Sequence, residues 1–166
     1  MDAYGTNEDF TAWVTANGFT LPEGANVDTL RLIGSSYIDA AYGAKLTCSH
    51  KTGGFEQELE WPRKGHITNR ELVPDTFIPP AWVKASYRAA YLEAMTPGWA
   101  TTGTDPNRVT RREQVDVISV EYFAPSDVSG SMEISQGMAF DASINGLVTP
   151  WLCSGVRRMS DLFRVI

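Results

Sequence analysis

Cysteine and histidine are the residues of this chain that could bind a metal ion or serve as nucleophile and base. The chain has two of each: Cys48, His50, His66 and Cys153. Cys48-Ser-His50 is closer than the paired spacing usual for zinc ligands, and the other two residues are isolated in the sequence. We therefore expect no metal site, with the cysteines as small buried hydrophobic residues and the histidines as loop residues.

Carboxylates and catalytic motifs give no stronger indication of chemistry. Glu56, Glu58 and Glu60 alternate, which is typical of a solvated strand face and would otherwise indicate a carboxylate metal site. The chain lacks a GxSxG motif, a phosphate-binding loop, an HExxH motif and a dinucleotide-binding motif. We expect a protein that is not an enzyme, with no catalytic residue and no bound cofactor.

Basic residues next to aromatic ones could bind a nucleic acid. The segment 61–66 (Trp-Pro-Arg-Lys-Gly-His) has this composition, and Arg108 with Arg111 and Arg112 forms a second basic cluster. The alternative is structural, with Trp61 anchoring a loop in the core and Arg63 binding a carboxylate or a backbone carbonyl. The net charge of −6 favours this structural interpretation, because tight phosphate binding requires an excess of Lys and Arg.

The cysteines and the N-terminus indicate where the protein is made. Cys48 and Cys153 are far apart and form no CxxC pair, which predicts a reduced protein made in the cytoplasm. Residues 1–6 lack the basic start and apolar run of a signal peptide. No apolar stretch approaches the length of a membrane span, so we expect no membrane contact.

Hydrophobic periodicity predicts a mainly α fold, a small helical bundle forming a single domain over residues 1–166. A first helix is expected at 7–17 with Asn7 as its cap, and a second from about Val27 to about Leu46. Small residues such as Gly34 would let another element approach the second helix closely. Pro79 and Pro80 predict the start of a third helix that stops at residues 96–98.

Between and after these helices the pattern predicts less regular structure. Residues 47–78 are repeatedly interrupted by Gly and Pro and should form a long inserted loop. Residues 109–137 should contain an extended β strand or hairpin followed by a loop, with a bulge or a change of environment near Asp116.

The C-terminal part is predicted to be an apolar helix segment followed by a tail. Because Pro150 interrupts the apolar pattern of residues 144–152, this helix should be kinked or begin only near Thr149. The tail, residues 156–166, combines basic and apolar side chains, and we expect it to bind a neighbouring subunit or another protein. The side chains expected to make this contact are Arg157, Arg158, Met159, Leu162, Phe163 and Arg164.

The order of several short motifs resembles a family of phage proteins described as DnaT-like single-stranded-DNA-binding proteins. The signature consists of Gln57, Trp61, Pro62 and Arg63, followed by Ile78-Pro79 at the head of a helix. A helix with Ser36-Tyr37-Ile38-Asp39 precedes it, and the resemblance spans roughly residues 25–155. The Gly-rich approach at 52–54 and the long loop at 124–137 depart from the family pattern.

Members of this family look like head-tail connector, or adaptor, proteins of tailed phages. The resemblance implies a structural virion protein of the neck, forming a homo-oligomeric ring of twelve subunits beneath the portal protein. A head-closure or tail-terminator protein would bind the other face, and DNA would pass through the ring without specific binding. The alternative that the family description names is a single-stranded-DNA-binding replication accessory protein.

Overall fold

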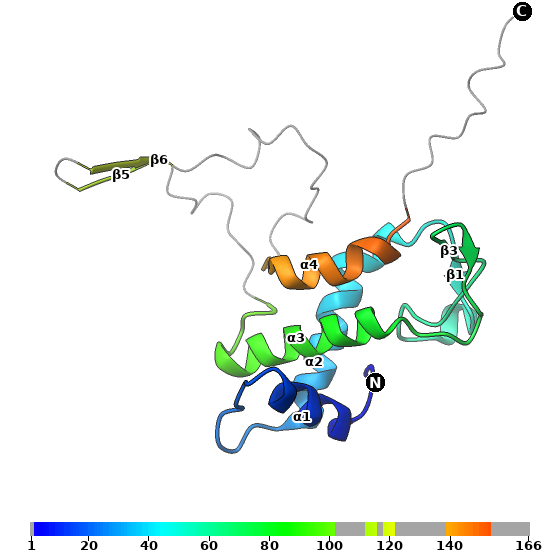
Figure 1. Ribbon diagram of the computed structural model, residues 1–166, viewed down its shortest axis with the longest axis horizontal. Helices are drawn as coiled ribbons and strands as arrows, with labels where there is room; N and C mark the ends of the chain where they lie inside the picture. Colours follow the sequence, from blue (N-terminus) through cyan, green and yellow to red (C-terminus); the bar gives the residue numbers. More distant parts are fainter. Residues whose placement is uncertain (1, 102–111, 116–117, 122–138, 154–166) are drawn as a thin grey trace, which may run out of the picture.

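The computed structural model describes residues 2–101, 112–115, 118–121 and 139–153 (Figure 1). The helices are α1 (Asn7–Ala16), α2 (Val27–Tyr42), α3 (Pro80–Met95) and α4 (Ala142–Val148). Single 3-10 turns follow α2 as η1 (Gly43–Lys45) and α4 as η4 (Thr149–Trp151), and η2 (Gly54–Glu56) lies in the connection from α2 to α3. The predicted mainly α fold is confirmed.

The strands are short and pair only as antiparallel hairpins. They are β1 (His50–Lys51) with β2 (Arg63–Lys64), β3 (Ile67–Thr68) with β4 (Glu71–Leu72), and β5 (Arg112–Val115) with β6 (Ile118–Glu121). Val115 lies opposite Ile118, so the extended segment contains a hairpin, which is one of the two forms predicted. Asp116, where a bulge or a change of environment was expected, lies outside the described residues. Pairing of the two strands satisfies backbone groups that a lone strand would leave unpaired.

Side-chain caps explain where the helices begin. Thr6, not Asn7, caps α1 by accepting a hydrogen bond from the backbone N–H of Asp9 at 3.1 Å. Asn26 caps α2 in the same way, through Thr29. Asp141 caps α4, so the predicted start near Thr149 is wrong, and Pro150 instead lies in the 3-10 turn η4.

The core lies where α2 crosses α3, with α4 packed alongside α3 (Figure 1). Its main cluster contains Tyr37, Ile38, Trp82 and Ile144, all buried. A second cluster, around Phe10, packs α1 against the same two long helices. Among the described residues, no helix is long and apolar enough to cross a membrane.

At Gly34 the helices α2 and α3 approach each other closely, as its small size predicted. A Cβ atom at this position would lie 2.3 Å from the backbone oxygen of Ser86 and 2.8 Å from the backbone nitrogen of Ala90. Backbone atoms cannot rotate away as a side chain can, so any larger residue has to separate the helices.

We predict that Gly34→Ala lowers the free energy of unfolding by roughly 1–3 kcal/mol through overpacking. Gly146→Ala in α4 is the matched control, because a Cβ there meets nothing within 4 Å. The control should be neutral or stabilise the protein by up to about 1 kcal/mol, since Ala favours helix over Gly. Urea denaturation measures both, and equal effects of the two substitutions would contradict the close approach.

Candidate functional site

The segment between α2 and α3, residues 46–79, contains the sequence signature and most of the polar chemistry of the described chain. Its two-residue strands supply few backbone hydrogen bonds, so side chains hold it together. It packs at one end of the helices, beside the end of α4 (Figure 1).

Arg63 is the polar centre of this segment and is buried. Its Nε donates to Ser49 Oγ at 2.7 Å, and its Nη2 donates to the carbonyl oxygens of Leu46 and Ser49 at 2.8 and 2.6 Å. Its Nη1 donates to the backbone and the carboxylate of Glu60. The prediction that Arg63 binds a carboxylate or a carbonyl is confirmed, and the guanidinium uses all its donor nitrogens inside the protein.

Trp61 is the apolar centre of the same segment and is completely buried. Its ring lies edge-on to Trp82 of α3 and Trp151 of η4, with centroids 6.1 and 5.9 Å apart. The peptide bond to Pro62 is cis. The predicted burial of Trp61 is confirmed, and it joins the loop to two helical elements at once.

The other signature residues also have structural surroundings. Gln57 donates through Nε2 to the carbonyl oxygens of Leu59 and Pro62, at 2.8 and 3.0 Å, and accepts from the N–H of Gly53. Pro79 is buried and precedes the first residue of α3, whereas Ile78 is exposed. Arg63 and Gln57 therefore act within the loop.

Asp39 of α2 binds three different segments through one partly buried carboxylate. It accepts hydrogen bonds from Tyr4 Oη at 2.7 Å, from Trp82 Nε1 at 3.1 Å and from the backbone N–H of Glu60 at 2.9 Å. Burial raises the pKa of Asp39, while these three donors act in the opposite direction. The carboxylate connects the N-terminal segment, α2, α3 and the loop.

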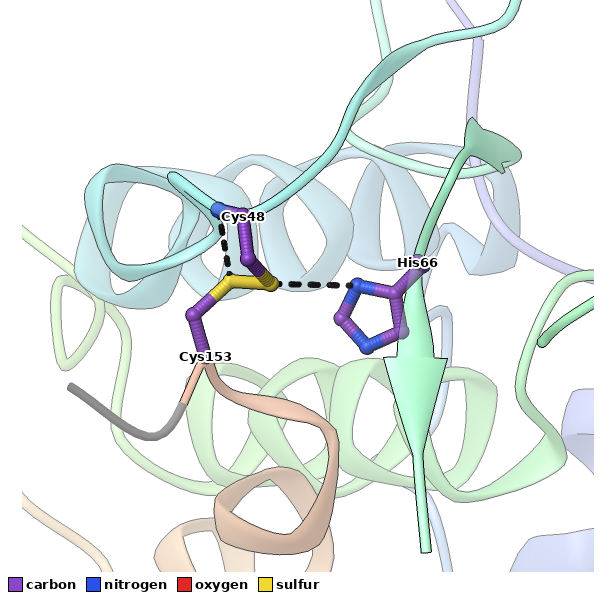
Figure 2. Close-up of side chains that lie close together, drawn as sticks. All are labelled: Cys48, His66 and Cys153. Atoms are coloured by element: carbon purple, nitrogen blue, oxygen red, sulfur yellow. Dashed lines mark hydrogen bonds between the residues drawn. A yellow bond between two sulfur atoms is a disulfide. The ribbon is translucent and has the colours of Figure 1, made fainter. Parts of the chain in front are cut away.

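Two cysteines and a histidine meet beside Arg63, at the point where the end of α4 touches the loop (Figure 2). Cys48 and Cys153 form a disulfide, so the prediction of reduced cysteines is wrong for this structure. Neither is fully buried either, since Cys48 is exposed and Cys153 half-buried. The prediction relied on the large distance between the two cysteines in the sequence. The packing of α4 on α3 brings Cys153 next to η1, where its N–H donates a hydrogen bond to the carbonyl oxygen of Lys45.

His66 lies against this disulfide and is 1% exposed. Its Nδ1 is 3.8 Å from Cys48 Sγ and 3.1 Å from Ser49 Oγ. Burial lowers the pKa of His66, the nearby Arg63 lowers it further, and a polar contact with the backbone of Trp151 raises it. A neutral imidazole therefore lies beside the two sulfur atoms, which the isolated positions of these residues in the sequence did not reveal.

The outer face of the β3–β4 hairpin exposes apolar side chains. Ile67 and Leu72 lie directly opposite each other and are 61% and 68% exposed. On the other face of the hairpin, Thr68 donates to the carbonyl of Pro150 at 2.9 Å, which attaches the hairpin to η4. The hairpin thus holds an apolar pair toward the solvent.

Basic side chains of the described body are largely occupied. Arg63 is buried, Lys51 pairs with Glu60 at 3.1 Å, and Arg88 pairs with Asp141 at 3.3 Å. Arg31 donates to the backbone carbonyls of residues 3–5. In residues 2–101, exposed Lys64, Arg70 and Lys84 lie on separate elements.

The predicted partner-binding residues Arg157, Arg158, Met159, Leu162, Phe163 and Arg164 lie outside the described residues, as do Arg108 and Arg111 of the second basic cluster. The predicted loop at 124–137 and tail at 156–166 lie there too.

Comparison with protein-family models matches residues 1–165 to the family described as "Putative DnaT-like ssDNA binding protein". No curated protein matches the chain. No solved structure matches it.

We predict that Trp61→Ala lowers the free energy of unfolding by about 3 kcal/mol or more, because it leaves a large cavity between the loop, α3 and η4. Phe55→Ala is the control, since Phe55 is fully exposed and its removal should change stability by less than about 0.5 kcal/mol. The urea midpoint gives both values. An unchanged midpoint for the Trp61 variant would show that this ring does not anchor the loop.

Proposed function

We propose that this chain, which belongs to the family of DnaT-like ssDNA-binding proteins, is a structural subunit of a phage neck. Single-stranded-DNA binding is the second candidate function. In this proposal the protein forms a ring, of twelve subunits, between the portal protein and a head-closure or tail-terminator protein. DNA passes through the ring without specific binding. The role is not enzymatic and places the protein in the virion.

The observation that carries this proposal is the exposed apolar pair on a fixed hairpin. Ile67 and Leu72 present apolar surface to solvent, although the hairpin is held from behind by the Thr68 hydrogen bond. Apolar side chains held in this way favour a contact with another protein surface. The charge agrees with this role, because the net charge of the chain is −6 and ion pairs engage Lys51, Arg63 and Arg88 within the protein.

The basic tail residues complete the proposed set of contacts. Arg157, Arg158 and Arg164 would pair with an acidic surface of the portal or of the next subunit, with Met159, Leu162 and Phe163 supplying apolar contact. A closed ring requires that each subunit offers two different surfaces, one to each neighbour. The hairpin and the tail are our candidates for these surfaces.

The second candidate is single-stranded-DNA binding, which the family description names. Within this chain it would depend on Arg108, Arg111 and Arg112, since the described body offers few unpaired cations. Affinity for a single strand should then fall steeply with salt, because each phosphate contact releases a counterion.

We predict that Ile67→Thr combined with Leu72→Thr prevents assembly onto portal-bearing heads while leaving the fold intact. Threonine keeps the strand preference of the hairpin and removes the apolar surface. Circular dichroism and the urea midpoint should be nearly unchanged, and electron microscopy should show heads without necks. Met95→Thr is the control, because Met95 is also exposed but lies at the end of α3. Normal assembly of the double variant would contradict the proposed contact.

We also predict that the protein shows no sub-micromolar affinity for a labelled single-stranded oligonucleotide near physiological salt. Fluorescence anisotropy measures this directly, with an established single-strand binder as the positive control. If tight binding is found, and Arg111→Ala with Arg112→Ala abolishes it, the second candidate replaces the first.

A further inference from the structure

Two cysteines and a histidine, residue types that can coordinate thiophilic metal ions, meet where the chain after α4 contacts the loop (Figure 2). They are Cys48, His66 and Cys153, whose ligand atoms all lie within 4.8 Å of one another. They come from three separate parts of the chain, after η1, before β3 and after η4. We propose that, when the disulfide is reduced, the two thiolates and His66 bind one Zn²⁺ ion.

The orientation of His66 supports this proposal in addition to the short distances between the three side chains. Ser49 Oγ accepts a hydrogen bond from Arg63 Nε at 2.7 Å and lies 3.1 Å from His66 Nδ1. The same Nδ1 lies 3.8 Å from Cys48 Sγ, so this nitrogen is next to both Ser49 and the disulfide. In the tautomer whose hydrogen is on Nε2, the Nδ1 lone pair can accept from Ser49 Oγ, and it would turn from this hydroxyl to an ion bound beside the sulfurs.

The ring of His66 is also held in place before any ion binds. It is 1% exposed and lies edge-on to Trp61 with centroids 4.8 Å apart. Its Nε2 is buried, and the ring also makes a polar contact with the backbone of Trp151. Histidines that ligate a metal ion usually hydrogen-bond a backbone carbonyl, a carboxylate or water through their other ring nitrogen, and the backbone of Trp151 would supply such a contact here.

Exchange of the disulfide for a zinc site requires a dithiol reductant and Zn²⁺. A cellular dithiol supplies two electrons and two protons to the disulfide, forming two protein thiols and its own disulfide. Zn²⁺ then displaces the two thiol protons and accepts an electron pair from each sulfur and from Nδ1. Two thiolates at about 2.3 Å from a tetrahedral ion lie about 3.8 Å apart, so the sulfurs must separate while the Cα atoms, now 5.6 Å apart, remain close.

The ion would replace the disulfide at the same place. Disulfides rarely persist in a reducing cytosol, whereas thiolate zinc sites are stable there. Three protein ligands leave one tetrahedral position to water. The end of α4 would thus be tied to the loop in both redox states, by a covalent bond when oxidised and by zinc when reduced.

The test uses the full chain, reduced with a phosphine and kept free of oxygen, with Co²⁺ as a spectroscopic probe. We expect thiolate-to-cobalt charge-transfer absorption that saturates at one ion per chain and disappears when Zn²⁺ is added. The oxidised protein should give none, and Cys48→Ser and Cys153→Ser should each abolish the band. His66→Gln should weaken binding by more than about tenfold. Removing a residue that only hydrogen-bonds to a metal ligand already costs about tenfold in affinity, and His66 would be a ligand itself.

His50→Gln is the matched control for His66, because His50 is exposed and only two residues from Cys48. It should bind like the wild type. X-ray absorption at the zinc edge of the wild-type protein provides a reading that does not depend on how well His66→Gln folds, and should show two sulfur and at least one nitrogen neighbour. The proposal is overturned if the reduced protein gives no cobalt band, if His50→Gln weakens binding as much as His66→Gln, or if the zinc shell lacks a histidine nitrogen.

Discussion

The carboxylate of Asp39 is the interaction on which the arrangement of the described chain depends most. It lies in the last turn of α2 and accepts hydrogen bonds from the N-terminal Tyr4, from Trp82 of α3 and from the loop at Glu60. An ionised carboxylate only accepts, and all three partners are donors, so no neutral side chain of similar size satisfies them equally. Tyr4 extends the network, since its hydroxyl accepts from the N–H of Trp61.

The long connection from α2 to α3 shows how a segment can be ordered with little regular secondary structure. Arg63 donates hydrogen bonds to backbone carbonyl groups that are not paired with a neighbouring strand. Trp61 fills the space between α3 and η4 and so supplies the apolar packing that a helix face would otherwise give. Such a segment depends on a few side chains, because a buried carbonyl that loses its donor costs about 1–3 kcal/mol. This explains why the signature residues Gln57, Trp61 and Arg63 occur close together.

The helices could be predicted from the sequence because their determinants are local. The prolines before α3 and the polar residue before α2 act within one turn, and Gly34 was recognised by its size alone. The joint at Cys48, His66 and Cys153 could not be predicted, because it depends on the packing of α4 against α3 across 105 residues. For β5 and β6 the sequence predicted extended structure as a single strand or a hairpin, and the pairing of the two strands decides for the hairpin, because alternation of side chains alone does not show which segments pair.

The sequence separation of that joint has a consequence for the protein as it leaves the ribosome. Residues enter a growing chain at about 5–20 per second, so the chain takes about 5–20 s to grow by the 105 positions from Cys48 to Cys153. The loop and α3 are added within this interval and before η4, so Trp61 exists for part of it without its contact with Trp151. Cys48 therefore has to wait as an unpaired thiol until the chain has grown past α4.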